Sequence, residues 1–301
     1  MEAQLYRTLY RHVMSIAHRR RPRVQFIDQL IVMVYLWSVL HERPVCWACD
    51  TDNWPKDLLG FELPSDSTMS QRLETPGVKQ LIERVLTAAA DLFPPTLVKS
   101  IDSKPLPVGA YSKDADAKRG RIAAGQFARG YRLNVLTHGR AVQSWTLAPM
   151  NDHDSLSAHT LLSHLRGGYG YVVADNAYDS NELHLAAAAQ NHQLVAPPRE
   201  ANKGVRDAKY NVPQRLRALD LLDESPLKHC GIRVGNFGAS SFGTELYNQR
   251  EAVESSFGEL SQMGLNHLPS WVRGPRRVAL WCAAKLLVYL CRLAKKKGLM
   301  S

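Results

Sequence analysis

Tyr171-Val172-Val173-Ala174-Asp175 is a short apolar run that ends on a carboxylate, and Leu97-Val98-Lys99-Ser100-Ile101 leads in the same way into Asp102. Runs of this length and composition predict strands. Asp is depleted in strands and is rarely buried without a partner. A single such Asp is commonly a loop cap. Two of them, ending two core strands about 4.8 Å apart, indicate a cation held at the edge of a sheet.

Outward from these two runs, the pattern predicts an α/β fold with a mixed sheet flanked by helices. Helical periodicity marks Ser155–Leu165 and Asn181–Asn191, which alternate with the later strands. The order is three strands, then helix, strand, helix, strand, which suits helices packed against a mixed sheet. The five predicted strands are 96–101, 131–137, 141–147, 171–174 and 192–197.

Residues 1–95 are predicted to form an all-helical N-terminal domain. Phe26–Leu40 is apolar on nearly all sides, and Leu81–Leu92 is rich in alanine and leucine, as in helices buried within a bundle. A short helix capped by Asp66 or Ser67 lies between them. It fits a helix-turn-helix DNA reader or a plain helical connection, and the plain connection is slightly favoured.

The remainder, 96–301, is predicted to be one domain that contains the sheet. Residues 198–246 are polar, basic and glycine-rich toward their end, which predicts an inserted loop-rich region before the predicted helix Leu246–Met263. Two helices, Leu246–Met263 and Pro275–Lys297, are expected to close the chain.

The charge balance favours a polyanionic partner. The 301 residues contain 38 Lys and Arg against 28 Asp and Glu, a net charge of +10, which suits nucleic acid or an anionic membrane surface. No signal peptide is visible, and the longest apolar runs fall short of the roughly 20 residues of a membrane span. Cys46-x-x-Cys49 lacks the second ligand pair of a zinc site, and the five cysteines form no disulfide pattern. We therefore expect reduced thiols and a cytoplasmic protein.

A third carboxylate, Glu254, lies on the predicted helix Leu246–Met263. Tyr247 and Arg250 precede it on one stripe, because seven steps of about 100° bring Tyr247 and Glu254 within roughly 20° of each other. On the helix alone, an Arg–Glu surface pair worth about 0.3 kcal/mol is an equally good interpretation. An adjacent apolar stripe is expected to pack on the sheet and consists of Val253, Phe257 and Leu260.

Three blocks of this sequence together resemble the DDE transposases of bacterial insertion sequences, in the group with the Tyr-Arg-Glu-Lys signature. The blocks are Ile-Asp-Ser-Lys-Pro (101–105), Ala-Asp-Asn-Ala-Tyr-Asp-Ser (174–180) and Tyr-x-x-Arg-x-x-x-Glu (247–254). The resemblance covers nearly the whole chain and includes Asn151-Asp152-His153-Asp154-Ser155. It departs at Ser261, where the signature has Lys, and at Asn176-Ala177, where Lys-Gly is common.

The resemblance implies an RNase H-like catalytic domain over 96–301, with 198–246 as its insertion region. It implies that Asp102, Asp175 and Glu254 are the catalytic residues and hold two Mg²⁺ ions, for which Mn²⁺ can substitute. The residues expected to contact DNA are Lys104, Tyr247 and Arg250, the arginine by a bidentate contact with phosphate.

The implied function is Mg²⁺-dependent cleavage at insertion-sequence ends and strand transfer into target DNA, which is cut-and-paste transposition. The expected partners are double-stranded DNA, as terminal inverted repeats and target, and a second copy of the chain on the paired ends, with no membrane. A bacterial, nucleoid-associated location follows from that role. The N-terminal helices are favoured over 198–246 as the reader of the ends. Two alternatives stay open: a plain metal-dependent DNA nuclease, and a catalytically inactive or domesticated DNA-binding regulator.

Overall fold

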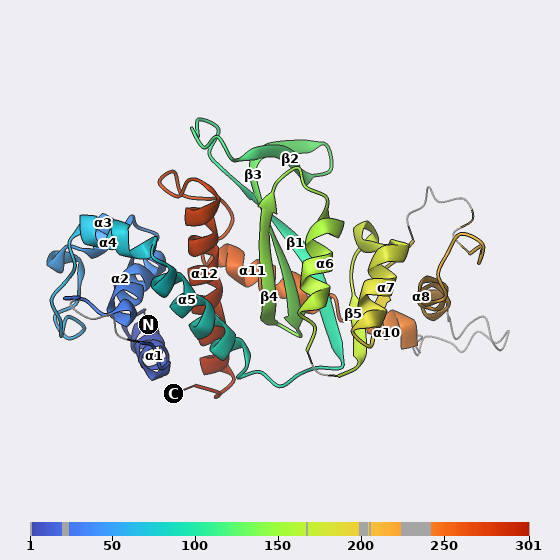
Figure 1. Ribbon diagram of the computed structural model, residues 1–301, viewed down its shortest axis with the longest axis horizontal. Helices are drawn as coiled ribbons and strands as arrows, with labels where there is room; N and C mark the ends of the chain where they lie inside the picture. Colours follow the sequence, from blue (N-terminus) through green and yellow to red (C-terminus); the bar gives the residue numbers. More distant parts are fainter. Residues whose placement is uncertain are drawn as a thin grey trace, which may run out of the picture. The chain divides into compact units, whose positions relative to one another are not determined.

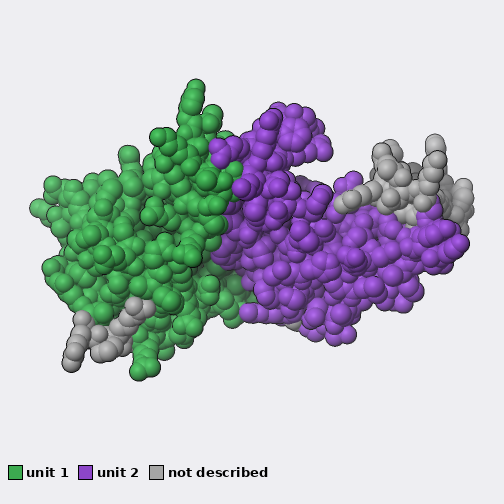
Figure 2. All heavy atoms as spheres, turned by 45° about the horizontal axis from the view of Figure 1, so that its top comes forward, with its two compact units in different colours: residues 1–93, 107–117, 259–301 green, residues 94–106, 118–258 purple. Residues whose placement is uncertain are grey.

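A computed structural model describes residues 2–19, 24–166, 168–198, 204, 206–223 and 242–300. The chain groups into two compact units, coloured separately in Figure 2. The sheet unit comprises residues 94–106 and 118–258, and the helical unit comprises residues 1–93, 107–117 and 259–301. Across the described ranges, none of the helices is both long enough and apolar enough to span a bilayer.

The sheet unit is built on one mixed six-stranded sheet (Figure 1). Its strands are β1 (Val98–Pro107), β2 (Lys118–Ala123), β3 (Gln126–His138), β4 (Ala141–Pro149), β5 (Gly170–Val173) and β6 (His192–Val195). The order is β2-β3-β1-β5-β6, with β4 paired to β3. Strands β1, β5 and β6 run parallel, whereas β3 is antiparallel to β2 and β4. The predicted mixed sheet flanked by helices is confirmed.

Both faces of β5 are buried, which explains why its sequence is continuously apolar. Val172 packs with Leu161 and Leu183, whereas Val173 faces the other way and packs with Leu246 and a partly buried Leu221. These side chains come from helices on opposite faces of the sheet. The helices of this unit are α6 (Asp154–Ser163), α7 (Asn181–Ala189), α8 (Pro213–Asp223), α10 (Phe242–Asn248) and α11 (Glu251–Gln262), with the 3-10 turn η2 (Asn176–Tyr178).

Three sequence-based predictions about these elements are wrong. Asp102 does not end its strand, because β1 continues to Pro107. The predicted helix Leu246–Met263 is two helices, since the backbone makes turns at Gln249 and Arg250. The described part of 198–246 is not only loop: α8 packs against β6 and α7. The rest of that predicted insertion, residues 199–203, 205 and 224–241, lies outside the described residues.

The helical unit surrounds α2 (Asp28–Leu40), an apolar helix with ten buried residues, as the sequence predicts. Ser65 rather than Asp66 or Ser67 caps α4, because its hydroxyl accepts the backbone N–H of Thr68 at 3.2 Å. The last helix packs against α5, α2 and α1, so residues 259–301 group with this unit. The division of function at residue 95 stays a prediction. The other helices are α1 (Glu2–Ser15), α3 (Val45–Ala48), α4 (Asp66–Leu73), α5 (Pro76–Ala90) and α12 (Pro275–Lys296), with the 3-10 turn η1 (Thr51–Asn53).

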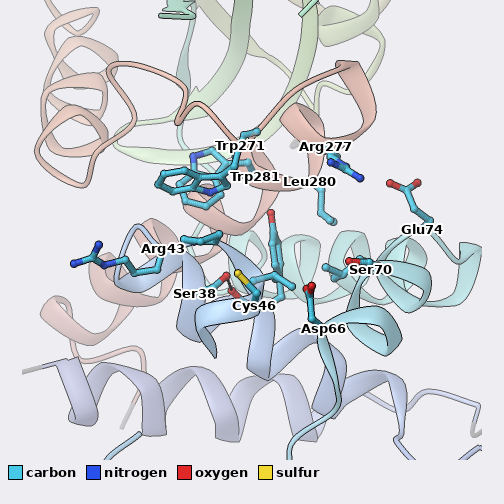
Figure 3. Close-up of a pocket in the computed structure, with 15 residues that line it drawn as sticks. Ser38, Arg43, Cys46, Asp66, Ser70, Glu74, Trp271, Arg277, Leu280 and Trp281 are labelled. Carbon is cyan, nitrogen blue, oxygen red and sulfur yellow. Dashed lines mark hydrogen bonds between the residues drawn. The ribbon is translucent and has the colours of Figure 1, made fainter. Parts of the chain in front are cut away.

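The helical unit also holds a cavity of about 200 Å³ (Figure 3). Trp281 of α12 and the nearby Trp271 line it on one side, and Asp66 and Ser70 of α4 line it on another. Acidic and basic side chains both contribute to its lining, including Arg43. None of the residues predicted to carry the chemistry lines this cavity.

A buried ion pair fastens α8 to the chain that follows Asp175. Asp179 is 4% exposed and Arg215 is 7% exposed. The Arg215 guanidinium donates from Nε to Asp179 Oδ1 at 2.7 Å and from Nη2 to Oδ2 at 2.6 Å. The bidentate geometry is the strongest form of this contact. The pair therefore limits where the loop after β5 can lie.

We predict that Arg215→Ala lowers the free energy of unfolding by about 3–5 kcal/mol, because it leaves the Asp179 carboxylate buried without its cation. Arg206→Ala is the matched control, since its pair with Asp220 is exposed and its loss is expected to cost less than about 1 kcal/mol. Urea unfolding of both variants measures the difference. Equal losses in the two variants would contradict the structural role of Asp179.

Candidate active site

The parallel register of β1 and β5 brings Asp102 and Asp175 to one edge of the sheet. The last paired residues are Ser100 and Val173, and each acid follows its paired residue by two positions. Because side chains alternate along a strand, Asp102 lies on the same face as Ser100 and Val98. This is the face that Leu246 of α10 covers.

Backbone N–H groups orient both carboxylates. Asp102 Oδ1 accepts the N–H of Ser103 at 2.8 Å. Asp175 caps the turn η2, where its Oδ1 accepts the N–H of Ala177 at 2.9 Å. Both side chains are half-buried. The two acids are thus held by local backbone contacts at the sheet edge.

Asp102 is electrostatically coupled to the other two acids. The pKa of Asp102 is raised to about 6, chiefly by burial and also by the charges of Asp175 and Glu254, whereas the Ser103 N–H and the charge of Arg250 oppose the shift. The charges of Asp175 and Glu254 therefore lie close enough to disfavour the ionisation of Asp102. The structure thus brings together the three acids that the sequence singles out.

Glu254 and Arg250 form an ion pair beside Asp102. Glu254 lies in the first turn of α11, with 52% of its side chain exposed, and Arg250 contacts it from the turn before that helix. The Arg250 guanidinium carbon is 6.0 Å from the centre of the Tyr247 ring. The pKa of Tyr247 is raised, first by burial and then by the charges of the three acids, and Arg250 opposes this rise. The break between α10 and α11 therefore leaves Tyr247, Arg250 and Glu254 together.

Lys104 lies two residues after Asp102, so alternation places it on the same face of β1. Its Nζ is 5.9 Å from the centre of the Phe257 ring on α11, and burial lowers the pKa of Lys104. Val253 and Leu260 of α11 are fully buried, as the predicted apolar stripe requires. Ser261, where the signature has Lys, lies near the end of the same helix.

The chemistry of the three acids suits a hard divalent cation. All three offer carboxylate oxygens, the ligands that Mg²⁺ prefers, and their mutual repulsion is relieved when a cation lies between them. The spacing of the carboxylates is less typical of a metal site than their chemistry is. Within the part of the chain that the structure describes, no three His, Cys, Asp or Glu side chains are grouped as a metal site. The positive charge beside Glu254 and Asp102 comes from Arg250.

Arg132 and Asp154 form a neighbouring network that the sequence reasoning missed. The Arg132 Nη1 donates to both carboxylate oxygens of Asp154 at 3.0 Å and to Ser103 Oγ at 3.4 Å. It therefore joins β3 and the start of α6 to the residue after Asp102. Tyr178 is also buried here, and its pKa is raised by burial and by the charges of Asp154, Asp102 and Asp175.

Comparisons with known proteins identify the family of the chain. The family described as "Transposase DDE domain" matches residues 94–291. Among solved structures, the chain is similar to the cryo-EM structure of the piggyBac transposase synaptic complex with hairpin DNA, with a TM-score of 0.50 and 11% identity over 99% of this chain and 73% of that chain. At that identity the likeness concerns the fold alone. No curated protein matches the chain.

The family match spans more than half of the chain, and it includes the two acids at the sheet edge and the third on α11. The chain therefore belongs to the DDE-domain transposases and is a DNA transposase.

Proposed function

We propose that this enzyme performs cut-and-paste transposition: cleavage at the ends of an insertion sequence, followed by joining of those ends to target DNA. The observation that supports it best is the register of β1 and β5, which sets Asp102 and Asp175 side by side. Glu254 supplies a third carboxylate coupled to Asp102. Carboxylates gathered at a sheet edge suit phosphoryl transfer, in which positioning and charge neutralisation supply most of the catalysis.

We propose that Asp102, Asp175 and Glu254 hold two Mg²⁺ ions, for which Mn²⁺ can substitute. Bound there, the ions would neutralise the developing charge and activate the attacking oxygen. The chain's own residues do the remaining work. Arg250 lies beside the acids, where its planar guanidinium can grip a phosphate of the scissile strand. Tyr247, whose ring lies beside the Arg250 guanidinium, and Lys104 are the other proposed contacts with DNA.

The proposed DNA partners are terminal inverted repeats and target duplex, which the net charge of +10 suits. The piggyBac structure is of a synaptic complex with hairpin DNA, and by analogy we propose a homodimer that holds two paired ends. A nucleoid-associated location in the bacterial cytoplasm fits that role. Residues 1–95 are the proposed reader of the ends.

We predict that purified enzyme, a labelled terminal repeat, a target plasmid and Mg²⁺ yield joined products. Asp102→Asn, Asp175→Asn and Glu254→Gln should each reduce joining to the metal-free background, because each removes an anionic ligand. Glu182→Gln is the control, since this glutamate is 86% exposed on α7, and it should keep full activity.

The same assay separates the alternatives. Release of cleaved ends without joining would identify a metal-dependent nuclease. DNA binding with no cleavage would identify a regulator. Joining that survives all three substitutions would contradict the proposed site.

We also predict a pH-dependent gain in stability for Asp102→Asn without divalent ions. The folded-state pKa of about 6 exceeds the ordinary 3.8, so the stabilisation of the protonated form is complete below 3.8 and lost as pH rises through 6. At pH 8 the Asn variant should therefore be more stable than wild type, by no more than about 3 kcal/mol.

Thermal melting between pH 4 and 8 measures this difference, which should vanish at the acid end. Added Mg²⁺ should stabilise the wild type more than Asp102→Asn. A variant that is less stable than wild type at pH 8 in a chelator would argue against an unfavourable charge at Asp102.

A further inference from the structure

The hairpin of β2 and β3 extends beyond the rest of the sheet as a two-stranded ribbon (Figure 1). The pairing of β3 with β4 begins at Tyr131 and Pro149. The preceding part of β3 pairs with β2, in a register that sets Arg119 opposite Arg129 and Arg121 opposite Phe127. The side chains of this ribbon therefore lie outside the part of the sheet in which β3 pairs with β4.

One face of the ribbon carries three arginines. Residues directly opposite each other in antiparallel strands project to the same side. Arg119, Arg121, Phe127 and Arg129 thus share a face, and all four are exposed, Phe127 by 58%. The other face bears Gly120, where a Cβ atom would clash with the Met150 carbonyl. The back of the ribbon is thus packed, and the basic face points outward.

The positive charges on this face do not stabilise the fold. Arg119 and Arg129 stand directly opposite each other, and like charges at such positions destabilise a strand pair. The sequence has no Asp or Glu between Asp116 and Asp152. Local contacts orient two of the arginines: the Arg119 guanidinium carbon is 5.9 Å from the Phe127 ring centre, and Arg121 Nε donates to the Ala123 carbonyl at 3.2 Å.

A hollow of about 450 Å³ lies beside the ribbon, and Gly120 and Met150 of the packed face line it. Arg121 of the ribbon lines it, together with Arg132 and Asp154. Ala177 lines it too, and this residue's N–H is held by Asp175. The hollow therefore lies between the ribbon and the turn that Asp175 caps.

We propose that Arg119, Arg121 and Arg129 bind the sugar–phosphate backbone of duplex DNA. This inference rests on the proposed function, which supplies the DNA. A two-stranded ribbon has the width that the major groove admits, about 12 Å, and guanidinium groups grip phosphates in bidentate fashion. The contact is with the backbone, so it is independent of base sequence. Phe127 supplies apolar contact beside the arginines.

The test uses the full chain carrying Asp102→Asn, so that binding is measured without cleavage. Fluorescence anisotropy records the affinity for a terminal-repeat duplex and for a scrambled duplex between about 50 and 200 mM salt. A triple variant, Arg119→Gln with Arg121→Gln and Arg129→Gln, should weaken both duplexes by at least about ten-fold at low salt. It should also reduce the slope of log affinity against log salt by about 2 to 3.

Two further variants separate binding from folding. The triple Arg→Lys variant keeps the charge but loses the bidentate contacts, so its affinity should lie between those of the wild type and the Gln triple variant. Arg129→Glu places an opposite charge across from Arg119, so it should raise the melting temperature while it lowers the affinity for DNA. A loss of binding together with a gain in stability cannot come from misfolding.

The inference is overturned if the Gln triple variant binds both duplexes with the wild-type affinity and salt slope. It is also overturned if only the terminal repeat is affected, since that would indicate base readout, or if polyglutamate competes as well as duplex of equal charge. These failures differ from failure of the proposed function. If the proposed function fails, the wild-type chain neither cleaves nor joins DNA, even if its ribbon binds DNA.

Discussion

The parallel pairing of β1 with β5 is the constraint on which the candidate active site depends. With Ser100 opposite Val173, the two carboxylates that follow must share one edge of the sheet. Both faces of β5 are buried under helices, so a slip of the register by one residue would turn buried side chains toward the wrong face. The hydrophobic core thus specifies the spacing of two charged groups that contribute nothing to it.

The surrounding polar contacts hold this edge in place and partly compensate its charge. Asp179 and Arg215 limit the loop after Asp175, while Arg132 joins Asp154 to the residue after Asp102. Arg250 supplies positive charge to Glu254 and Asp102. In the proposed function, Arg250 also binds a phosphate of the DNA. The same guanidinium therefore neutralises the acids and binds the substrate.

Sequence reasoning reached the sheet, most helices and the three acids, because strand and helix periodicity is strongest where both faces of an element are buried. It missed β2, whose basic residues show no apolar alternation, and it shortened β1, where Pro105 argues against a strand. The break at Gln249 and Arg250 was hidden because the apolar spacing continues across it. Arg132 carries no motif, and its contact with Asp154 spans 22 residues of sequence, so only the folded chain reveals it.

In the proposed function, Asp102, Asp175 and Glu254 together hold the two divalent metal ions. Replacement of Mg²⁺ by Fe²⁺, with ascorbate and peroxide, generates radicals that cut the backbone near the bound ion. The account predicts cuts clustered around residues 102, 175 and 254, all suppressed by excess Mg²⁺. Cuts confined to other segments, or cuts that omit the neighbourhood of Glu254, would contradict it.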